Sequence, residues 1–137
     1  MPWEHFSHQA DMGIRGRGAS KEEAFEQAAM ALTAVITDPN KVEPRTSIMV
    51  EQDDADDELL FADWINALVY EMATRKMLFG RFRVAFAGQS LMGEAWGEPV
   101  DIAKHQPAVE VKGATYTALQ VRQESGGEWI AQCVVDV

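Results

Sequence analysis

The stretch HFSHQADMGIRGRGAS, residues 5–20, changes its pattern twice and so sets the order of the first structural elements. Residues 2–7 have the pattern of a short strand. From residue 11 to residue 18, apolar residues alternate with small or charged ones, as in a half-buried strand. Ser20 then opens the segment SKEE, a capping box that starts a helix. Asp11 is the only carboxylate at the junction of the two strands. A second group that would act together with it, for example in binding a ligand, has to come from elsewhere in the chain.

The periodicity of the remaining chain predicts two helices and a series of strands. Apolar residues at helical spacing indicate a first helix from Ser20 to Pro39, which ends it. The second helix is expected over LLFADWINALVYEMATRKM, residues 59–77, after the acidic run DDADDE, because carboxylates at a helix start complement its dipole. Further strands are expected at 46–52, 81–86, 91–96, 109–123 and 128–137, with a connection at 97–107 and a hairpin turn at ESGGE, 124–128.

Together these elements predict an α+β fold. We expect one two-layer domain spanning residues 1–137, made of mainly antiparallel sheet packed with two main helices. A chain of this length can bury a core without disulfides or a structural metal.

The composition restricts the partners of the protein. Twelve basic and 22 acidic residues give a net charge of −10, which argues against direct binding of nucleic acid, because phosphate contacts need clustered Lys and Arg. An acidic surface suits cation binding or docking on a basic protein, and it also keeps a protein in solution without further function.

The cysteine count and the hydropathy pattern indicate the compartment. Cys133 is the only cysteine, so no intramolecular disulfide can form and a reducing compartment is expected. The first residues lack the pattern of a signal peptide, and no apolar run is long enough to span a membrane. We therefore expect a cytoplasmic protein with no membrane association.

The end of the chain, CVVDV, is unusual because its last strand stays apolar almost to the final residue. A terminus held in a sheet places the Asp136 side chain beside the main-chain carboxylate of Val137. If Asp11 came from a neighbouring strand, the three groups would offer oxygen donors to a hard divalent cation such as calcium or magnesium. The alternative is a solvated chain end and an Asp11 that caps a turn. Spacing alone leaves both interpretations open.

Motifs along the whole chain resemble the archease family. HQADMGI and GASKEEAFEQAA are similar to the family's opening, which usually reads His-Thr-Ala-Asp, an aliphatic residue and Gly, followed by a Ser-capped acidic helix. The similarity continues through LLFADWINALVYE and VEVKGATY to the closing WIAQCVVDV, in the same order and at similar separations. The match thus covers essentially all of the sequence.

The resemblance implies a function in RNA processing without catalysis by the chain itself. Archeases activate the tRNA-splicing RNA ligase, which uses GTP and manganese to join a 2′,3′-cyclic-phosphate or 3′-phosphate end to a 5′-hydroxyl. They promote guanylylation of the ligase's histidine and allow it to turn over repeatedly in tRNA splicing or RNA repair. The cation-binding carboxylates of the family correspond to Asp11, Asp136 and Val137, so the resemblance implies a divalent metal ion (calcium, magnesium or manganese) as cofactor and the ligase as partner.

The sequence departs from the family pattern at three positions. Gln9 replaces the usual Thr, Gly113 replaces Ala, and Thr117 stands where His is common. The first two changes are tolerable, but Thr117 cannot serve as a histidine would, and it is left out of the predicted site.

Two other functions compete with the activator hypothesis. One is a metal-dependent phosphoester hydrolase that uses the same carboxylates with His8, and the other is a metal-stabilised, chaperone-like binding module. His5, His8 and Asp11 spell H-x-x-H-x-x-D, but on a continuous strand residues three apart lie on opposite faces, so the three would not converge without a turn. We expect polar surface contacts for His5, His8 and His105; a further hypothesis is that His8 orients the Asp11 carboxylate.

Overall fold

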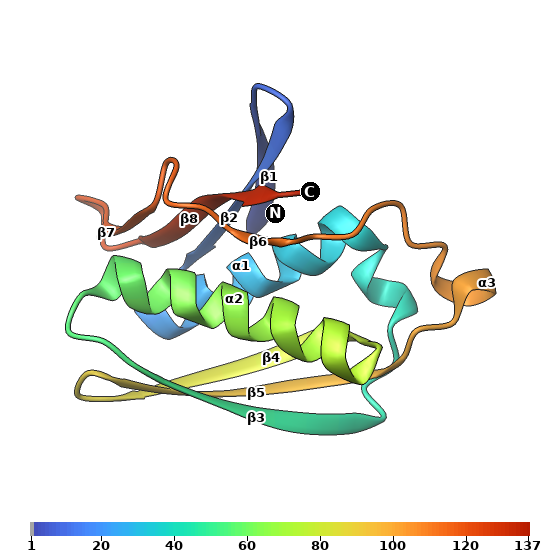
Figure 1. Cartoon of the computed structure of the whole chain (residues 1–137). Coiled ribbons are helices and arrows are strands. Elements are labelled where there is room, and N and C mark those ends of the chain that lie inside the picture. Colours follow the sequence, from blue (N-terminus) through green and yellow to red (C-terminus); the bar gives the residue numbers. More distant parts are fainter. Residues whose placement is uncertain (1) are drawn as a thin grey trace.

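The computed structural model describes residues 2–137 and contains two antiparallel sheets with helices between them (Figure 1). One sheet has the strand order β1-β2-β8-β6, with β7 also paired to β8, and the other has the order β3-β5-β4. The elements are β1 (Trp3–His8), β2 (Asp11–Gly18), α1 (Lys21–Ile36), the 3-10 helix η1 (Pro39–Lys41), β3 (Thr46–Asp53), α2 (Asp57–Arg75), β4 (Met77–Ala87), β5 (Ser90–Pro99), α3 (Ile102–His105), β6 (Gly113–Ala114), β7 (Gln120–Gln123) and β8 (Trp129–Asp136).

The α+β class, the antiparallel pairing and the two main helices predicted from sequence are confirmed. The layering adds one feature to the predicted two-layer arrangement: the strands divide into two sheets, and α1 and α2 lie between them. Apolar side chains can therefore leave the helix layer in both directions. This explains why each main helix has buried residues over so much of its circumference.

The capping box at the start of α1 forms as expected, with one difference. The Glu23 amide donates to Ser20 Oγ at 3.1 Å, as the motif predicts. The Glu23 carboxylate reaches back one residue further than the motif requires and accepts from the Ala19 amide at 2.8 Å. Both bonds satisfy amides at the turn from β2 into α1, and they fix the direction in which α1 leaves the sheet.

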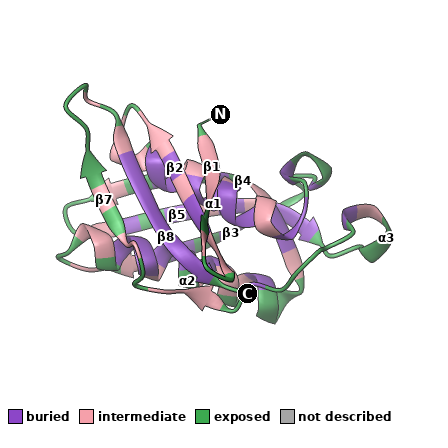
Figure 2. Cartoon of the chain, turned by 90° about the horizontal axis from the view of Figure 1, so that it is seen from above, coloured by how far each residue is buried: buried purple, intermediate pink, exposed green. Residues whose placement is uncertain are grey.

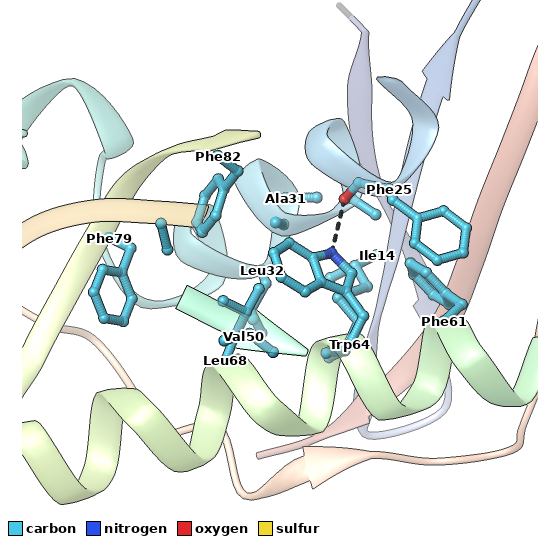
Figure 3. Packing of buried hydrophobic residues seen from close by; sticks show 14 of the residues in the cluster. Ile14, Phe25, Ala31, Leu32, Val50, Phe61, Trp64, Leu68, Phe79 and Phe82 are labelled. Carbon is cyan, nitrogen blue, oxygen red and sulfur yellow. Dashed lines mark hydrogen bonds between the residues drawn. The ribbon is translucent and has the colours of Figure 1, made fainter. Parts of the chain in front are cut away.

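Trp64 of α2 connects the helix layer to the sheet formed by β3, β5 and β4, and Figure 3 shows its indole directed at Phe25 of α1. Its indole Nε1 donates to the Phe25 carbonyl of α1 at 3.1 Å, so this buried polar group is satisfied within the core. The ring covers Gly93 of β5, where a Cβ would collide with it, and it meets Phe82 of β4 edge to face at 6.3 Å. The position of α2 is thus set by one large side chain that contacts three elements.

Two segments differ from the sequence prediction. The connection 97–107 contains the short helix α3. The strand expected over 109–123 is two short strands, β6 and β7, separated by a turn in which Ala118 has φ 55°. Both pair with β8, so the hairpin expected around 124–128 is present but short.

The prediction of a surface contact for His105 is wrong, because its side chain is buried against Glu98. His105 Nδ1 accepts from the Asp101 amide at 2.9 Å, which leaves Nε2–H to donate to the Glu98 carboxylate at 2.9 Å. Glu98, whose side chain is only 5% exposed, also accepts from the Glu43 amide at 2.9 Å and from Lys104 Nζ at 2.8 Å. The cluster fastens the 97–107 connection to the end of β5.

These donors change the acidity of Glu98. The hydrogen bond from the Glu43 amide, followed by those from Lys104 and His105, outweighs burial and lowers the pKa of the Glu98 carboxyl to about 2. The charged form is therefore the one that the folded protein stabilises.

Gly16 offers a test of the packing between α1 and β2. A Cβ at this position would collide with the Ala24 carbonyl and the Ala28 amide, which are backbone atoms that cannot rotate away. Gly16→Ala should lower the free energy of unfolding by about 1–3 kcal/mol through overpacking, measured by urea denaturation. Gly126→Ala is the matched control, because nothing lies within 4 Å of its Cβ position. Equal stability of the two variants would contradict the close approach.

The Glu98 cluster predicts a pH dependence of stability. Because the folded pKa lies below the ordinary value of 4.5, the stabilisation is complete above about pH 4.5 and is lost as the pH falls towards 2. The difference in free energy of unfolding between the wild type and Glu98→Gln should shrink over that interval. Denaturation curves at several pH values measure it, with the exposed Glu110→Gln as control. A difference that stays constant would refute the assignment.

Candidate functional site

The two ends of the chain lie side by side in one sheet, because β2 pairs with β8 (Figure 1). The antiparallel register places Met12 opposite Val135. Asp11, the first residue of β2, and Asp136, the last of β8, stand one position further along the same ladder. Cross-strand neighbours in an antiparallel pair point to the same face. The sequence hypothesis required this neighbourhood of the chain ends, and the register provides it.

The face that carries the two carboxylates is the outer one. Ile14 and Cys133, opposite each other in the same ladder, are fully buried towards the helices, so the side chains of odd-numbered β2 residues such as Asp11 point away from them. Asp11 is half-buried, whereas Asp136 and Val137 are exposed. Figure 2 shows β8 buried along most of its length and exposed at the end of the chain. The site therefore lies at the rim of the sheet, open to a partner molecule.

A tight turn aligns His8 with Asp11. The two residues are directly paired in the β1–β2 hairpin, and Gln9 in the turn between them has φ 53°. This turn removes the objection that residues three apart point to opposite faces. His5 does not join them: its Nε2 lies 2.8 Å from the Ala31 carbonyl of α1, on the inner side of the sheet. The H-x-x-H-x-x-D sequence thus contributes two neighbouring side chains, not three.

The arginines of the GIRGRG segment are engaged elsewhere on the outer face. Arg15 donates to Gln132 at 2.8 Å and forms an ion pair with Glu4 at 3.3 Å. Arg17 pairs with Glu4 at 2.7 Å and with Glu128 at 3.1 Å. Within residues 2–137, no basic side chain forms an ion pair with Asp11 or Asp136. The negative charge at the rim is therefore not neutralised by these arginines.

The donor set consists of oxygen ligands for a hard cation. Two side-chain carboxylates and the terminal carboxylate of Val137 are the candidates, and carboxylate oxygens are the ligands that Ca²⁺, Mg²⁺ and Mn²⁺ prefer. No cluster of three or more His, Cys, Asp or Glu side chains suited to a metal occurs within residues 2–137. A cation held here would consequently depend on the main-chain carboxylate or on groups of a partner.

Other parts of the chain lie close to the same rim. The Lys112 amide donates to the Asp136 carbonyl at 2.7 Å, and Gly113 pairs with Asp136 across the ladder between β6 and β8. The Thr117 carbonyl accepts from the Val134 amide at 3.1 Å, so the position at which the family often has His lies next to β8. The sequence alone could not place these residues, because the chain makes a turn between β6 and β7.

Cys133 does not have the properties of a reactive thiol, and the helices that the structure describes do not have those of a membrane span. The thiol is fully buried, and this burial raises its pKa to about 12, so it is a structural thiol. Among residues 2–137, no helix combines the length and the apolar character needed to cross a bilayer.

Comparisons with a family model and with individual proteins point to the same family. The model of the archease protein family matches residues 3–137. Protein archease of Pyrococcus furiosus is 39% identical over 139 residues, which cover 98% of each chain, and that of Methanopyrus kandleri is 36% identical over the full length of both.

Solved structures agree with the sequence comparison. The solution structure of Methanobacterium thermoautotrophicum protein 1598 is 31% identical, covers 99% of each chain and superposes with a TM-score of 0.87. A crystal structure from Thermotoga maritima, described as an archease and possible chaperone, covers 96% of this chain and 94% of its own at 19% identity and a TM-score of 0.64. This second likeness concerns the fold alone.

The adjacent carboxylates predict a measurable repulsion. Like charges at neighbouring cross-strand positions destabilise a sheet by about 0.2–1 kcal/mol. In low salt with a chelator present, Asp11→Asn should therefore raise the free energy of unfolding by an amount in that range, measured by chemical denaturation. Glu110→Gln removes one negative charge from an exposed site that is not part of the β2–β8 ladder and should change stability less. Destabilisation by Asp11→Asn would show that the carboxylate makes a favourable contact instead.

Proposed function

This chain belongs to the archease family, and from that membership we propose that it is a non-catalytic, cytoplasmic activator of an RNA ligase. The ligase uses GTP and manganese to join a 2′,3′-cyclic-phosphate or 3′-phosphate RNA end to a 5′-hydroxyl in tRNA splicing or RNA repair. The observation that carries the proposal is the pairing of β2 with β8, which puts Asp11 beside Asp136 and the chain end.

We propose that Asp11, Asp136 and the carboxylate of Val137 hold a divalent cation at the rim. Such a cation would supply positive charge close to the triphosphate of GTP when the activator is docked. The residues of this chain fix its position: Asp11 is held by the β1–β2 hairpin and Asp136 by β6 and β8. Guanylylation brings a triphosphate, metal ions and a histidine together, and its barrier falls when these charges are positioned in advance.

The acidic surface supports docking on an RNA-binding enzyme. The chain has a net charge of −10, and at the rim the side chains of Asp11 and Asp136 have no ion-pair partner within residues 2–137. An enzyme that binds RNA presents basic groups to it. Attraction between the two surfaces would accelerate association, and added salt would weaken it.

A hydrolase that uses the same carboxylates is the second candidate, because His8 is directly opposite Asp11. In that case the protein alone, incubated with phosphoester substrates and Mg²⁺ or Mn²⁺, should show turnover. The activator proposal expects no turnover without the ligase. A ligase that is indifferent to the protein would instead favour the chaperone-like module.

Asp11→Asn tests the activator proposal. With the cognate ligase, GTP, Mn²⁺ and RNA ends, the wild-type protein should raise both guanylylation and the number of turnovers. The variant should lose most of this activation, at least about tenfold, because one cation ligand is replaced by a neutral amide. Radiolabelled GMP transfer and ligation under multiple-turnover conditions measure the two effects. Asn has nearly the size of Asp, and a circular dichroism spectrum and melting curve of the variant separate loss of activation from misfolding; Glu110→Gln is the matched control.

Appending a few residues after Val137 separates the terminal carboxylate from the side chains. The extension moves that carboxylate away from Asp136 and leaves the core of the sheet unchanged, because Val137 lies beyond the end of β8. Activation should fall while the melting temperature stays the same. Full activation by both the extended protein and Asp11→Asn would refute the site.

A further inference from the structure

The strand β3 forms an unprotected edge on the side of the molecule away from the chain end (Figure 1). It pairs with β5 along its whole length, Thr46–Asp53, and has no strand on its other side. Within residues 2–137, no hydrogen bond other than this ladder engages the backbone of β3. The strand contains no proline, no lysine and no bulge, three of the devices that prevent pairing with another chain, and its charged residues, Glu51 and Asp53, are both acidic.

The opposite edge of the same sheet, β4, is covered by α1. Thr33 Oγ1 donates to the Phe79 carbonyl at 2.6 Å, and the Val84 amide donates to the Glu26 carboxylate at 2.8 Å. These two side chains occupy edge groups of β4 that another strand would otherwise use. Of the two edge strands of this sheet, β4 is therefore covered and β3 is free.

A groove of about 470 Å³ runs along the free edge of β3. We call it the β3 groove. Residues 49–52 of β3 form one wall, and one face of α2 forms the other. The residues on the α2 side recur at helical spacing and are Asp63, Asn66, Ala67, Tyr70 and Glu71. An extended segment that pairs with β3 would therefore lie between the strand and the helix.

Two exposed apolar side chains belong to residues that line the β3 groove: Tyr70 on α2, and Met49, which points to the outer face of the sheet because its neighbours Ile48 and Val50 are buried towards the helices. Met49 is 56% exposed and Tyr70 is 65% exposed. Exposed aromatic and methionine side chains are enriched at protein interfaces, where they become anchors on burial. The groove thus offers apolar contacts next to free backbone groups.

The charge of the groove is negative. Glu51 is a lining residue of β3 that points to the outer face of the sheet beside Met49, and Asp63 and Glu71 lie on the α2 wall. Glu71 has a partner in Arg75, but Asp63 forms no ion pair within residues 2–137. Burial, together with the charge of Asp54, raises the pKa of the Asp63 carboxyl. A cationic side chain in the groove would relieve this effect.

We propose that the β3 groove binds an extended segment of a partner protein in which Lys or Arg alternates with apolar residues, and that this segment adds to the sheet as a fourth strand beside β3. Backbone hydrogen bonds to the free edge supply affinity, as in other cases of strand addition. One face of the segment presents cations to Asp63 and Glu71, and the other lies beside Met49. The proposal stands independently of the ligase and of the rim formed by Asp11 and Asp136.

A synthetic peptide of alternating Lys and Val, labelled with a fluorophore, is the probe, and anisotropy titration of the full-length protein measures its affinity. The same peptide with its central backbone nitrogens methylated keeps its charge but cannot pair as a strand. Methylation should weaken binding at least about tenfold, because the hydrogen bonds to the edge are lost. A Glu-Val peptide of equal length should not bind.

Variants locate the binding site. Glu51→Lys places a positive charge on the β3 wall and should weaken binding by about fivefold or more, whereas Glu110→Lys makes the same change in net charge at an exposed site outside the groove and should have less than about twofold effect. Tyr70→Ala, at an exposed position, should also weaken binding. The proposal is overturned if the Lys-Val peptide does not bind at millimolar concentration, if the methylated peptide binds equally well, or if the two Glu→Lys variants lose affinity equally.

Discussion

The antiparallel ladder between β2 and β8 is the constraint on which the rest of the structure depends. It joins residues near the two ends of the chain, from Met12 with Val135 to Gly18 with Trp129, and places β8 in the centre of its sheet. Every other strand of that sheet pairs with one of these two: β1 with β2, and β6 and β7 with β8. Because the pairing connects residues more than a hundred positions apart, it also explains why the last strand is apolar almost to the final residue: β8 is buried from Ile130 to Val135.

The helix layer is fixed by contacts in which backbone and large side chains come unusually close. Gly16 lets α1 lie directly on β2, and Gly93 lets the indole of Trp64 lie on β5. A single indole then joins α2 to the Phe25 carbonyl of α1 at 3.1 Å. Close packing of this kind leaves the helices little freedom to shift between the sheets. The rim formed by Asp11 and Asp136 and the β3 groove therefore both lie on closely packed elements.

Some charged side chains of this structure form ion pairs, and others have no partner of opposite charge. The arginines of β2 form ion pairs with Glu4 and Glu128 on the outer face of the sheet, and the buried Glu98 forms an ion pair with Lys104. Carboxylates without an ion-pair partner within residues 2–137 include Asp11 and Asp136 at the rim near the chain end and Asp63 in the β3 groove. An acidic protein can thus present two separate negative surfaces, one suited to a cation and a basic enzyme, the other to an extended basic segment.

The sequence by itself determined the local elements and the family. The capping box at Ser20, the apolar stripe of the second helix and the Asp11 and Asp136 motifs could all be recognised because they depend on residues close in sequence, or on order along the whole chain. Tertiary structure decided the rest. The division of the strands into two sheets, the burial of His105 against Glu98 and the turn at Gln9 that aligns His8 with Asp11 depend on contacts between distant residues or on a backbone conformation that a residue type only weakly favours. Local patterns specify which face of an element is apolar, but only the packed chain specifies what that face meets.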